Sequence, residues 1–406
     1  MTTMLAWLSR DGKLLLAANI ARMFGFGFVS IILAIYLKSA GYDALSSGII
    51  ITATLVSSSF FTLFASVYAD RIGRRKILML FSGLMVIAGL IFAFTTDYYL
   101  LLIAALIGLI NATGVNFGPF ISIEQAIMPQ TSSDKKRNYA FALYQTTGTF
   151  AMAAGTLFAK LPEMLQQQGF DVISSFKPLF LAYVLIGIAT MAIYYSMSKM
   201  SEVQSEDRRK KVVLSSKTKS IVKRLSILFG MDSFAGGFVI PTWVAYWFFT
   251  RFDVSLGEVS EIMFYAIMLT AVSYLVAARL AGRIGLVNTM VFTHIPSNIL
   301  LIVLAIAPTL QIAIIVYLIR MSLSQMDVPT RQSYVVAIVS PEERTAVAGI
   351  TNLSRNIPFS VSPTLVGYSF QFVSLAFPFF FAGALKTAYD LLLYKNFRRI
   401  KPPEEK

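Results

Sequence analysis

The chain has 406 residues, of which 56% are hydrophobic and only 14% are charged, and its formal net charge is +14. Soluble proteins are nearer a quarter charged, so this composition excludes an ordinary globular protein and favours a chain that lies in lipid. There is no cysteine and one histidine, which excludes disulfides, thiol chemistry and a histidine-cluster metal site, and we expect no metal and no cofactor.

Apolar segments of about 20 residues recur along the sequence, each long enough to cross a hydrocarbon core of about 30 Å as a helix. The first is too long for a signal-peptide core and no small-residue cleavage site follows it, so we interpret it as a retained helix. The sequence predicts an all-α polytopic membrane protein with twelve spans, at 14–38, 45–69, 77–96, 99–128, 138–159, 178–198, 222–249, 257–281, 287–307, 310–337, 345–368 and 373–394.

The loops between these spans alternate in charge. Lys and Arg gather in the N-terminus, the even-numbered loops and the C-terminal tail. The positive-inside rule therefore predicts that both termini are cytoplasmic, in a multi-pass protein of the plasma membrane. We interpret the basic excess as an orientation signal, so the lipid bilayer is an expected partner and nucleic acid is not.

A long polar loop divides the chain into six spans and six. We expect an N-terminal six-helix bundle at 1–198, a cytoplasmic linker at 199–220 and a C-terminal six-helix bundle with a short tail at 221–406. Three short matches link the halves in the same order and at nearly the same offset: DRIG with GRIG, EQ with RQ, and SDKKR with SPEER. They indicate a parallel repeat, a common feature of transporters.

The loop after the second span reads SVYADRIGRRK, from Ser66 to Lys76. The loop has a small residue four positions before Asp-Arg and then the run G-R-R-K, and a degenerate copy follows the eighth span. In these motifs the sequence resembles the major facilitator superfamily, and the resemblance covers nearly the whole chain. The family's leading glycine is Ser66 here, which is still small enough for close helix packing. The resemblance implies two pseudo-symmetric six-helix bundles in a secondary-active transporter, not an enzyme, that works as a monomer.

The loop motif has two interpretations. As a topology anchor, its bases lie among lipid headgroups, but an anchor does not explain Asp70. The resemblance implies instead that Asp70 and Arg71 help to latch the two halves on the cytoplasmic side. Gly73 permits the tight turn. Further members expected on that side are Ser66, Arg74, Arg137 and Arg344.

Ionisable residues inside spans are costly in hydrocarbon and tend to mark functional interiors. Four are predicted near mid-depth: Arg22, Asp232, Asp327 and Arg355. In facilitator folds the first, fourth, seventh and tenth spans line the central cavity, which by resemblance places the first three of these residues there. The alternative is a neutral cluster that only holds helices together. Phe234, on the seventh span, either lines the same site or faces lipid.

Nearer the cytoplasm lie Glu124 on the fourth span and Arg331 on the tenth, which we interpret as a gate between the halves. Asp327 and Arg331 are four residues apart, a spacing that permits a local ion pair. By the same spacing, we expect Lys386 and Asp390 to pair with each other. Arg320 is expected to snorkel to the outer membrane edge.

We expect Arg22 and Arg355 to attract an anionic or polar group of a small organic solute, and Asp232 or Asp327 to couple transport to protons. Export of amphipathic drugs is an alternative, which the fifth span disfavours because it lacks the proline-containing glycine run of many facilitator exporters. A membrane sensor that binds without transport is a more distant alternative.

Overall fold

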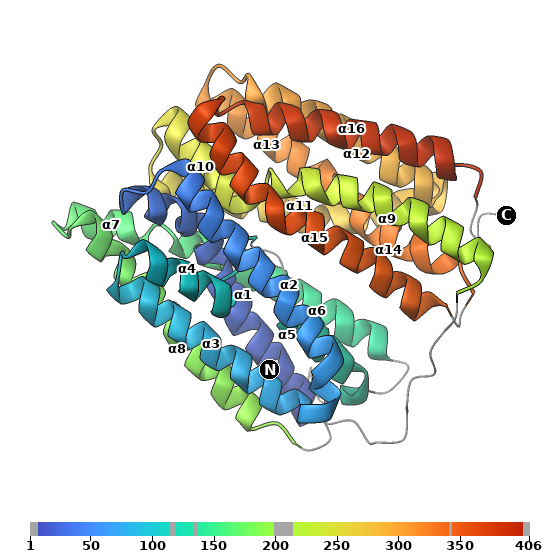
Figure 1. Cartoon of the computed structure of the whole chain (residues 1–406), viewed down its shortest axis with the longest axis horizontal. Helices are drawn as coiled ribbons and strands as arrows, with labels where there is room; N and C mark the ends of the chain where they lie inside the picture. Colours follow the sequence, from blue (N-terminus) through green and yellow to red (C-terminus); the bar gives the residue numbers. More distant parts are fainter. Residues whose placement is uncertain (1–6, 114–117, 133–135, 199–213, 341–342, 401–406) are drawn as a thin grey trace. The chain divides into compact units, whose positions relative to one another are not determined.

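A computed structural model of the chain describes residues 7–113, 118–132, 136–198, 214–340 and 343–400. Every regular element in these ranges is a helix (Figure 1). The first half contains α1 (Arg10–Ser39), α2 (Ala44–Ile72), α3 (Arg74–Phe94), α4 (Tyr98–Ile107), α5 (Pro119–Ile127), the 3-10 helix η1 (Met128–Thr131), α6 (Arg137–Phe158), α7 (Leu161–Gln167) and α8 (Val172–Tyr195). The second half contains α9 (Ser216–Gly237), α10 (Pro241–Phe252), α11 (Leu256–Ile284), α12 (Leu286–Ala305), α13 (Leu310–Ser324), α14 (Asp327–Ala337), α15 (Arg344–Phe372) and α16 (Phe377–Phe397).

Each predicted span corresponds to one helix or to two consecutive helices. By length and apolar composition alone, eight helical segments of the described chain qualify as membrane spans. The fourth, seventh and tenth spans are each broken in two, as α4 and α5, α9 and α10, and α13 and α14. The prediction of an all-α membrane fold with twelve helices is confirmed.

Local sequence accounts for the breaks. After α4 the backbone turns at Leu109, whose φ of 53° is left-handed, and α5 restarts behind Gly118, whose φ is 116°. Pro119 and Pro241 occupy the first turns of α5 and α10, where a residue without an N–H costs no helical hydrogen bond. Non-helical backbone at membrane depth is tolerated where it is buried in protein or lines a wet cavity.

The described helices form two compact units. The first comprises residues 1–207 and 240–264, and the second comprises 208–239 and 265–406. In the first unit α1 packs against α6 and α8, and α3 against α8. In the second, α9 packs against α15, and α12 against α16 (Figure 1). The seventh span is thus shared, with α9 in one unit and α10 in the other.

Three hydrogen bonds show how α10 joins the rest of the first unit. The hydroxyl of Thr242 lies 2.7 Å from the carbonyl oxygen of Ser30 on α1 and 2.5 Å from that of Ala112. At the far end of α1, the Lys38 ammonium donates to the Thr250 hydroxyl at 3.0 Å. Because buried carbonyls rarely lack a donor, the bond to Ala112 satisfies a carbonyl that the broken fourth span leaves open.

Small residues set a close contact between α1 and α6 in the first unit. A Cβ added to Gly155 on α6 would lie 2.0 Å from the carbonyl oxygen of Phe24 on α1, and one added to Gly27 would lie 2.2 Å from the carbonyl oxygen of Met152. No side chain fits at either position. Close backbone approach through small residues is the usual way in which membrane helices associate, and it fixes α1, which carries Arg22.

Candidate functional site

A fully buried ion pair lies in the first unit. The guanidinium of Arg22 donates to both carboxylate oxygens of Glu124, from Nη1 at 2.9 Å and from Nη2 at 2.7 Å. Both side chains have 0% exposure. This two-pronged geometry is the strongest form of arginine–carboxylate contact, and it fixes orientation as well as charge.

Two tyrosines complete the surroundings of this pair. The Tyr194 hydroxyl on α8 donates to Glu124 Oε1 at 2.7 Å, and the Tyr144 hydroxyl on α6 bonds to Oε2. The guanidinium lies over the ring of Phe120, 4.3 Å from its centroid, a cation–π contact. Both carboxylate oxygens of Glu124 are therefore engaged, and Arg22, which we expected to attract solute, is already neutralised within its own unit.

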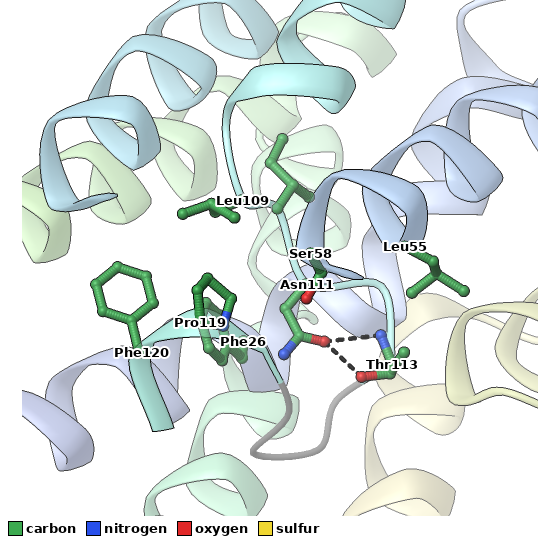
Figure 2. A pocket seen from close by; sticks show the side chains of 9 residues that line it. Phe26, Leu55, Ser58, Leu109, Asn111, Thr113, Pro119 and Phe120 are labelled. Atoms are coloured by element: carbon green, nitrogen blue, oxygen red, sulfur yellow. Dashed lines mark hydrogen bonds between the residues drawn. The ribbon is translucent and has the colours of Figure 1, made fainter. Parts of the chain in front are cut away.

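A small pocket adjoins this pair at the break in the fourth span (Figure 2). The side-chain oxygen of Asn111 accepts hydrogen bonds from the backbone N–H of Thr113 at 2.8 Å and from its hydroxyl at 2.7 Å. These bonds hold the irregular backbone after α4. The other residues that line the pocket come from α1, α2, the α4–α5 connection and the start of α5: Phe26, Leu55, Ser58, Leu109, Ile110, Pro119 and Phe120.

The second unit contains a larger charged cluster, which we call the Asp232 cluster: Asp232, Asp327, Arg331, Arg355 and Lys386. Asp232 Oδ1 accepts from the Lys386 ammonium at 2.6 Å. Its Oδ2 lies 3.5 Å from Arg331 Nη1 and 3.4 Å from Arg355 Nη1. Arg331 also bonds to Asp327, one helical turn earlier on α14, so the local pair predicted from their spacing is confirmed.

Counted over its five members, the Asp232 cluster has three bases and two acids; Asp390, one turn from Lys386, lies outside this set and bonds to His294 and Asn298. Arg355, on α15, is the cluster's most exposed base, with 23% of its side chain accessible against 8% for Arg331 and 9% for Lys386. Its contact with Asp232 is also long. A long, partly exposed contact is the one that another anion displaces most easily.

The expected pairing of Lys386 with Asp390 is wrong. Lys386 bonds to Asp232 on α9, whereas Asp390 accepts from Asn298 Nδ2 at 2.8 Å and lies 2.9 Å from the ring nitrogen Nδ1 of His294. A four-residue spacing allows Lys386 and Asp390 to form a pair on one helix, but Lys386 bonds instead to a carboxylate that packing brings close from another helix. The sequence thus missed Lys386 as a member of the Asp232 cluster.

Arg320 does not snorkel. It is buried, with 6% exposure, and it lies ten residues after the start of α13 at Leu310, which is about 15 Å along a helix. That depth is close to the middle of a hydrocarbon core of about 30 Å.

Phe234 lies two residues after Asp232 on α9 and is half-buried. Its ring packs edge-on against Phe238, with centroids 5.4 Å apart, and against Phe381, with centroids 6.2 Å apart. These three rings form an aromatic cluster within the second unit, so Phe234 packs against protein and not only against lipid.

The loop motif forms a compact turn between α2 and α3. Gly73 has a φ of 111°, which a residue with a Cβ rarely adopts. Arg74 Nε donates to Asp70 Oδ1 at 2.8 Å and Nη1 donates to the carbonyl of Ala126 at 3.0 Å, near the end of α5. Asp70 therefore orients a base that caps the helix bearing Glu124.

The other expected members of the cytoplasmic gate are less engaged. Ser66 bonds to the carbonyl of Leu63 in its own helix at 2.8 Å. The side chains of Arg71 and Arg344 are exposed. Arg137 begins α6, but its side chain lies outside the part of the chain that the structure describes. Glu124 and Arg331 each bond within their own unit, and their role as a gate stays a prediction.

The two ion pairs occupy matching places in the repeat with their signs exchanged. Arg22 on the first span pairs with Glu124 on the fourth, and Asp232 on the seventh contacts Arg331 on the tenth. The sequence comparison aligned Glu124 with Arg331, through the match of EQ with RQ, but did not pair either residue with a partner in its own half. The sequence did contain a signal for this pairing, since Glu124 and Arg331 are equivalent positions of opposite charge. Equivalent residues in a parallel repeat have equivalent neighbours, so each could be expected to face an opposite charge within its own half.

A polytopic chain of broken and continuous helices, with ion pairs buried inside its units, is the architecture of a membrane transporter. The sequence profile described as Major Facilitator Superfamily matches residues 15–363. The chain belongs to that superfamily, and it is a transporter rather than an enzyme.

Similar proteins agree with this assignment. An uncharacterized membrane protein of Saccharomyces cerevisiae, YJR124C, is 25% identical over 420 residues, covering 95% of this chain and 93% of the yeast protein. The structure of the nucleoside transporter NupG superposes with a TM-score of 0.74 at 14% identity, covering 96% of this chain and 99% of NupG. A D-xylose–proton symporter gives 0.73 at 13% identity, with 96% and 98% coverage. The human organic anion transporter MFSD10 gives 0.66 at 15% identity, with 95% and 99% coverage. At these identities the structures show a shared fold.

Proposed function

We propose that this protein moves a small anionic organic solute across the plasma membrane by alternating access, with protons as the coupling ion. The surplus positive charge of the Asp232 cluster carries the proposal, together with the exposure of Arg355. Burying an uncompensated charge is costly, so a cluster with one extra base favours an anion. An anionic group that binds Arg355 replaces its weak contact with Asp232.

Competition between the solute anion and Asp232 for Arg355 supplies a route to proton coupling. Asp232 contacts three bases. When a solute draws Arg355 away, Asp232 loses one of them, and losing a cationic partner in a buried site favours the protonated form of a carboxyl. Asp327 is bonded to Arg331, a base that also contacts Asp232. Binding of an anion and binding of a proton then assist each other.

The remaining residues take supporting roles. Phe234 forms one wall of the solute site, and Arg22, held by Glu124, keeps the first and fourth spans together during transport. Asp70, Arg71, Gly73, Arg74 and Ser66 form the cytoplasmic latch, with Arg137, Arg331 and Arg344 near it. In this arrangement both termini are cytoplasmic and the protein works as a monomer.

The test starts from purified protein screened for thermal stabilisation by carboxylate- and phosphate-bearing metabolites, since a bound ligand raises stability by mass action. A stabilising compound is then used in radiolabelled form for counterflow and for pH-driven uptake into proteoliposomes. We expect Arg355→Gln to weaken binding and counterflow. We expect Asp232→Asn and Asp327→Asn to abolish pH-driven accumulation but to keep counterflow.

The matched control is Glu261→Gln, which removes an exposed acid of α11 and should leave every rate unchanged. If both Asn variants keep full pH-driven accumulation, proton coupling through these acids is wrong. Binding without any exchange of label would contradict transport and favour a sensor.

The aromatic cluster of Phe234, Phe238 and Phe381 favours a second candidate, export of amphipathic compounds. Here, exchange assays with an uncharged amphipathic dye should give saturable flux that falls when Phe234 is replaced by alanine. Flux of anions alone would contradict this candidate.

A further inference from the structure

Arg320 differs from the other buried bases of the described chain. Arg22, Arg74, Arg331 and Lys386 are also buried, and each is bonded to a carboxylate. Among the residues that the structure describes, Arg320 forms no ion pair within 4.0 Å. Its positive charge is the only one of the five that no carboxylate neutralises.

The contacts that Arg320 does make are weak. Its Nη1 lies 3.2 Å from the thioether sulfur of Met321, and a thioether is a poor acceptor. Its buried Nε has no hydrogen-bond partner. A guanidinium has five N–H donors, so most of the hydrogen-bonding capacity of Arg320 is left for another group.

Arg320 lies on a polar stripe of the tenth span. The buried residues of α13 recur at three- and four-residue intervals, as Tyr317, Arg320 and Ser324, so they share one helix face. Asp327 and Arg331 continue the same intervals on α14 beyond the break. The unpaired base is thus followed along the stripe by two members of the Asp232 cluster.

An unpaired charge near mid-membrane destabilises the protein unless something binds it. We propose that Arg320 binds an anionic group of the solute at a position of its own on the tenth span, a carboxylate or a phosphate, with the hydroxyls of Tyr317 and Ser324 beside it. This inference rests on the proposed function and deepens it. Arg320 adds a second anion-binding residue to Arg355, and the contact of Arg355 with Asp232 connects binding to protons.

The first experiment measures the thermal unfolding of purified, ligand-free protein. We expect Arg320→Gln to unfold at a higher temperature than the wild type, because it removes an uncompensated buried charge. The matched control Arg279→Gln replaces an exposed arginine of α11 and should leave the midpoint unchanged. A purely structural arginine predicts the opposite result, so a lower midpoint in Arg320→Gln would overturn the inference.

The second experiment measures stabilisation by succinate, benzoate, inorganic phosphate and glycerol 3-phosphate, with glycerol as the neutral control. Loss of charge-assisted hydrogen bonds should weaken binding of the active anion by about 10- to 100-fold in Arg320→Gln. Arg320→Lys should retain part of the affinity, more for phosphate than for carboxylate, because lysine keeps the charge without the planar fork. Carboxylate and phosphate probes decide which anion the site takes.

Two results would contradict the site: unchanged anion affinity in Arg320→Gln, or no stabilisation of the wild type by any of these probes. The outcomes separate this inference from the transport proposal. Anion flux that survives Arg320→Gln contradicts the site but leaves transport standing. Anion binding that requires Arg320 but gives no flux in proteoliposomes supports the site and contradicts transport.

Discussion

Replacing Glu124 by glutamine should destabilise the protein strongly, because it removes the carboxylate that is bonded to Arg22. The pair has two charge-assisted hydrogen bonds, at 2.7 and 2.9 Å, and neither side chain is exposed. Breaking a buried pair and leaving one charge uncompensated costs about 3–5 kcal/mol. In a unit of this size each kcal/mol lowers the unfolding midpoint by about 2–4 °C, so the expected fall is about 6–20 °C.

The assay heats detergent-solubilised protein and measures the folded fraction by size-exclusion chromatography. The double variant with Arg22→Met should recover much of the lost stability, because neutralising both partners removes the uncompensated charge. We expect a coupling free energy of about 2 kcal/mol or more between the two positions.

Asp70→Asn is the matched control in the same unit. The Asp70 side chain is 45% exposed, and exposed ion pairs contribute about 0–1 kcal/mol. Its midpoint should therefore fall by less than about 4 °C. A Glu124→Gln protein within about 2 °C of the wild type, or a double variant as unstable as the sum of the single changes, would refute the reasoning.

Three further predictions concern packing, capping and the join to α10. Gly155→Ala should lower the unfolding midpoint, because the added Cβ would meet the backbone of Phe24 at 2.0 Å. Gly83→Ala should not, because there is open space around Gly83. Equal midpoints for the two variants would contradict the close packing of α1 against α6. Hydrogen bonds from the Ser215 N–H and the Thr218 hydroxyl hold the pKa of Glu343 below its usual range. The ionised Glu343 should therefore stabilise the folded protein above the unfolded pKa of about 4.3. This stabilisation should be lost as pH falls through the lower pKa of the folded state. The midpoint difference between wild type and Glu343→Gln should accordingly be largest near neutral pH and shrink in acid, and a difference independent of pH would refute this account. Thr242→Val should lower the midpoint modestly by removing the hydroxyl donor that is shared between the buried carbonyls of Ser30 and Ala112, and it should do so more than Thr250→Val, because Thr250 is only partly buried.

Hydropathy was sufficient to predict the spans. In lipid, a helix must satisfy its backbone hydrogen bonds within itself, so each span is a continuous apolar run whose length can be seen in the sequence. Local rules also predicted the Asp327–Arg331 pair, since a four-residue spacing is fixed by helix geometry. Pro119 and Pro241 mark two of the three breaks.

Pairings between distant helices could not be predicted in this way. Arg22 and Glu124 are 102 residues apart, and their contact depends on how α1, α5 and α6 pack. Lys386 had a plausible partner one turn away and instead bonds to Asp232 across the second unit. The partial exposure of Arg355 and the lack of a described ion pair at Arg320 likewise depend on how the helices pack. Local sequence patterns do not predict either feature.

The division of the seventh span between the two compact units has a mechanical consequence. Within the seventh and eighth spans, the chain passes from one unit to the other between Val239 and Ile240 and again between Phe264 and Tyr265. At the first crossing the helix has already ended at Gly237, and Pro241 has no N–H to contribute. Rotation of the backbone there therefore breaks no helical hydrogen bond, whereas the second crossing lies inside the continuous helix α11. The first of these two crossings thus lies in an interruption between helices, and the second lies within a continuous one.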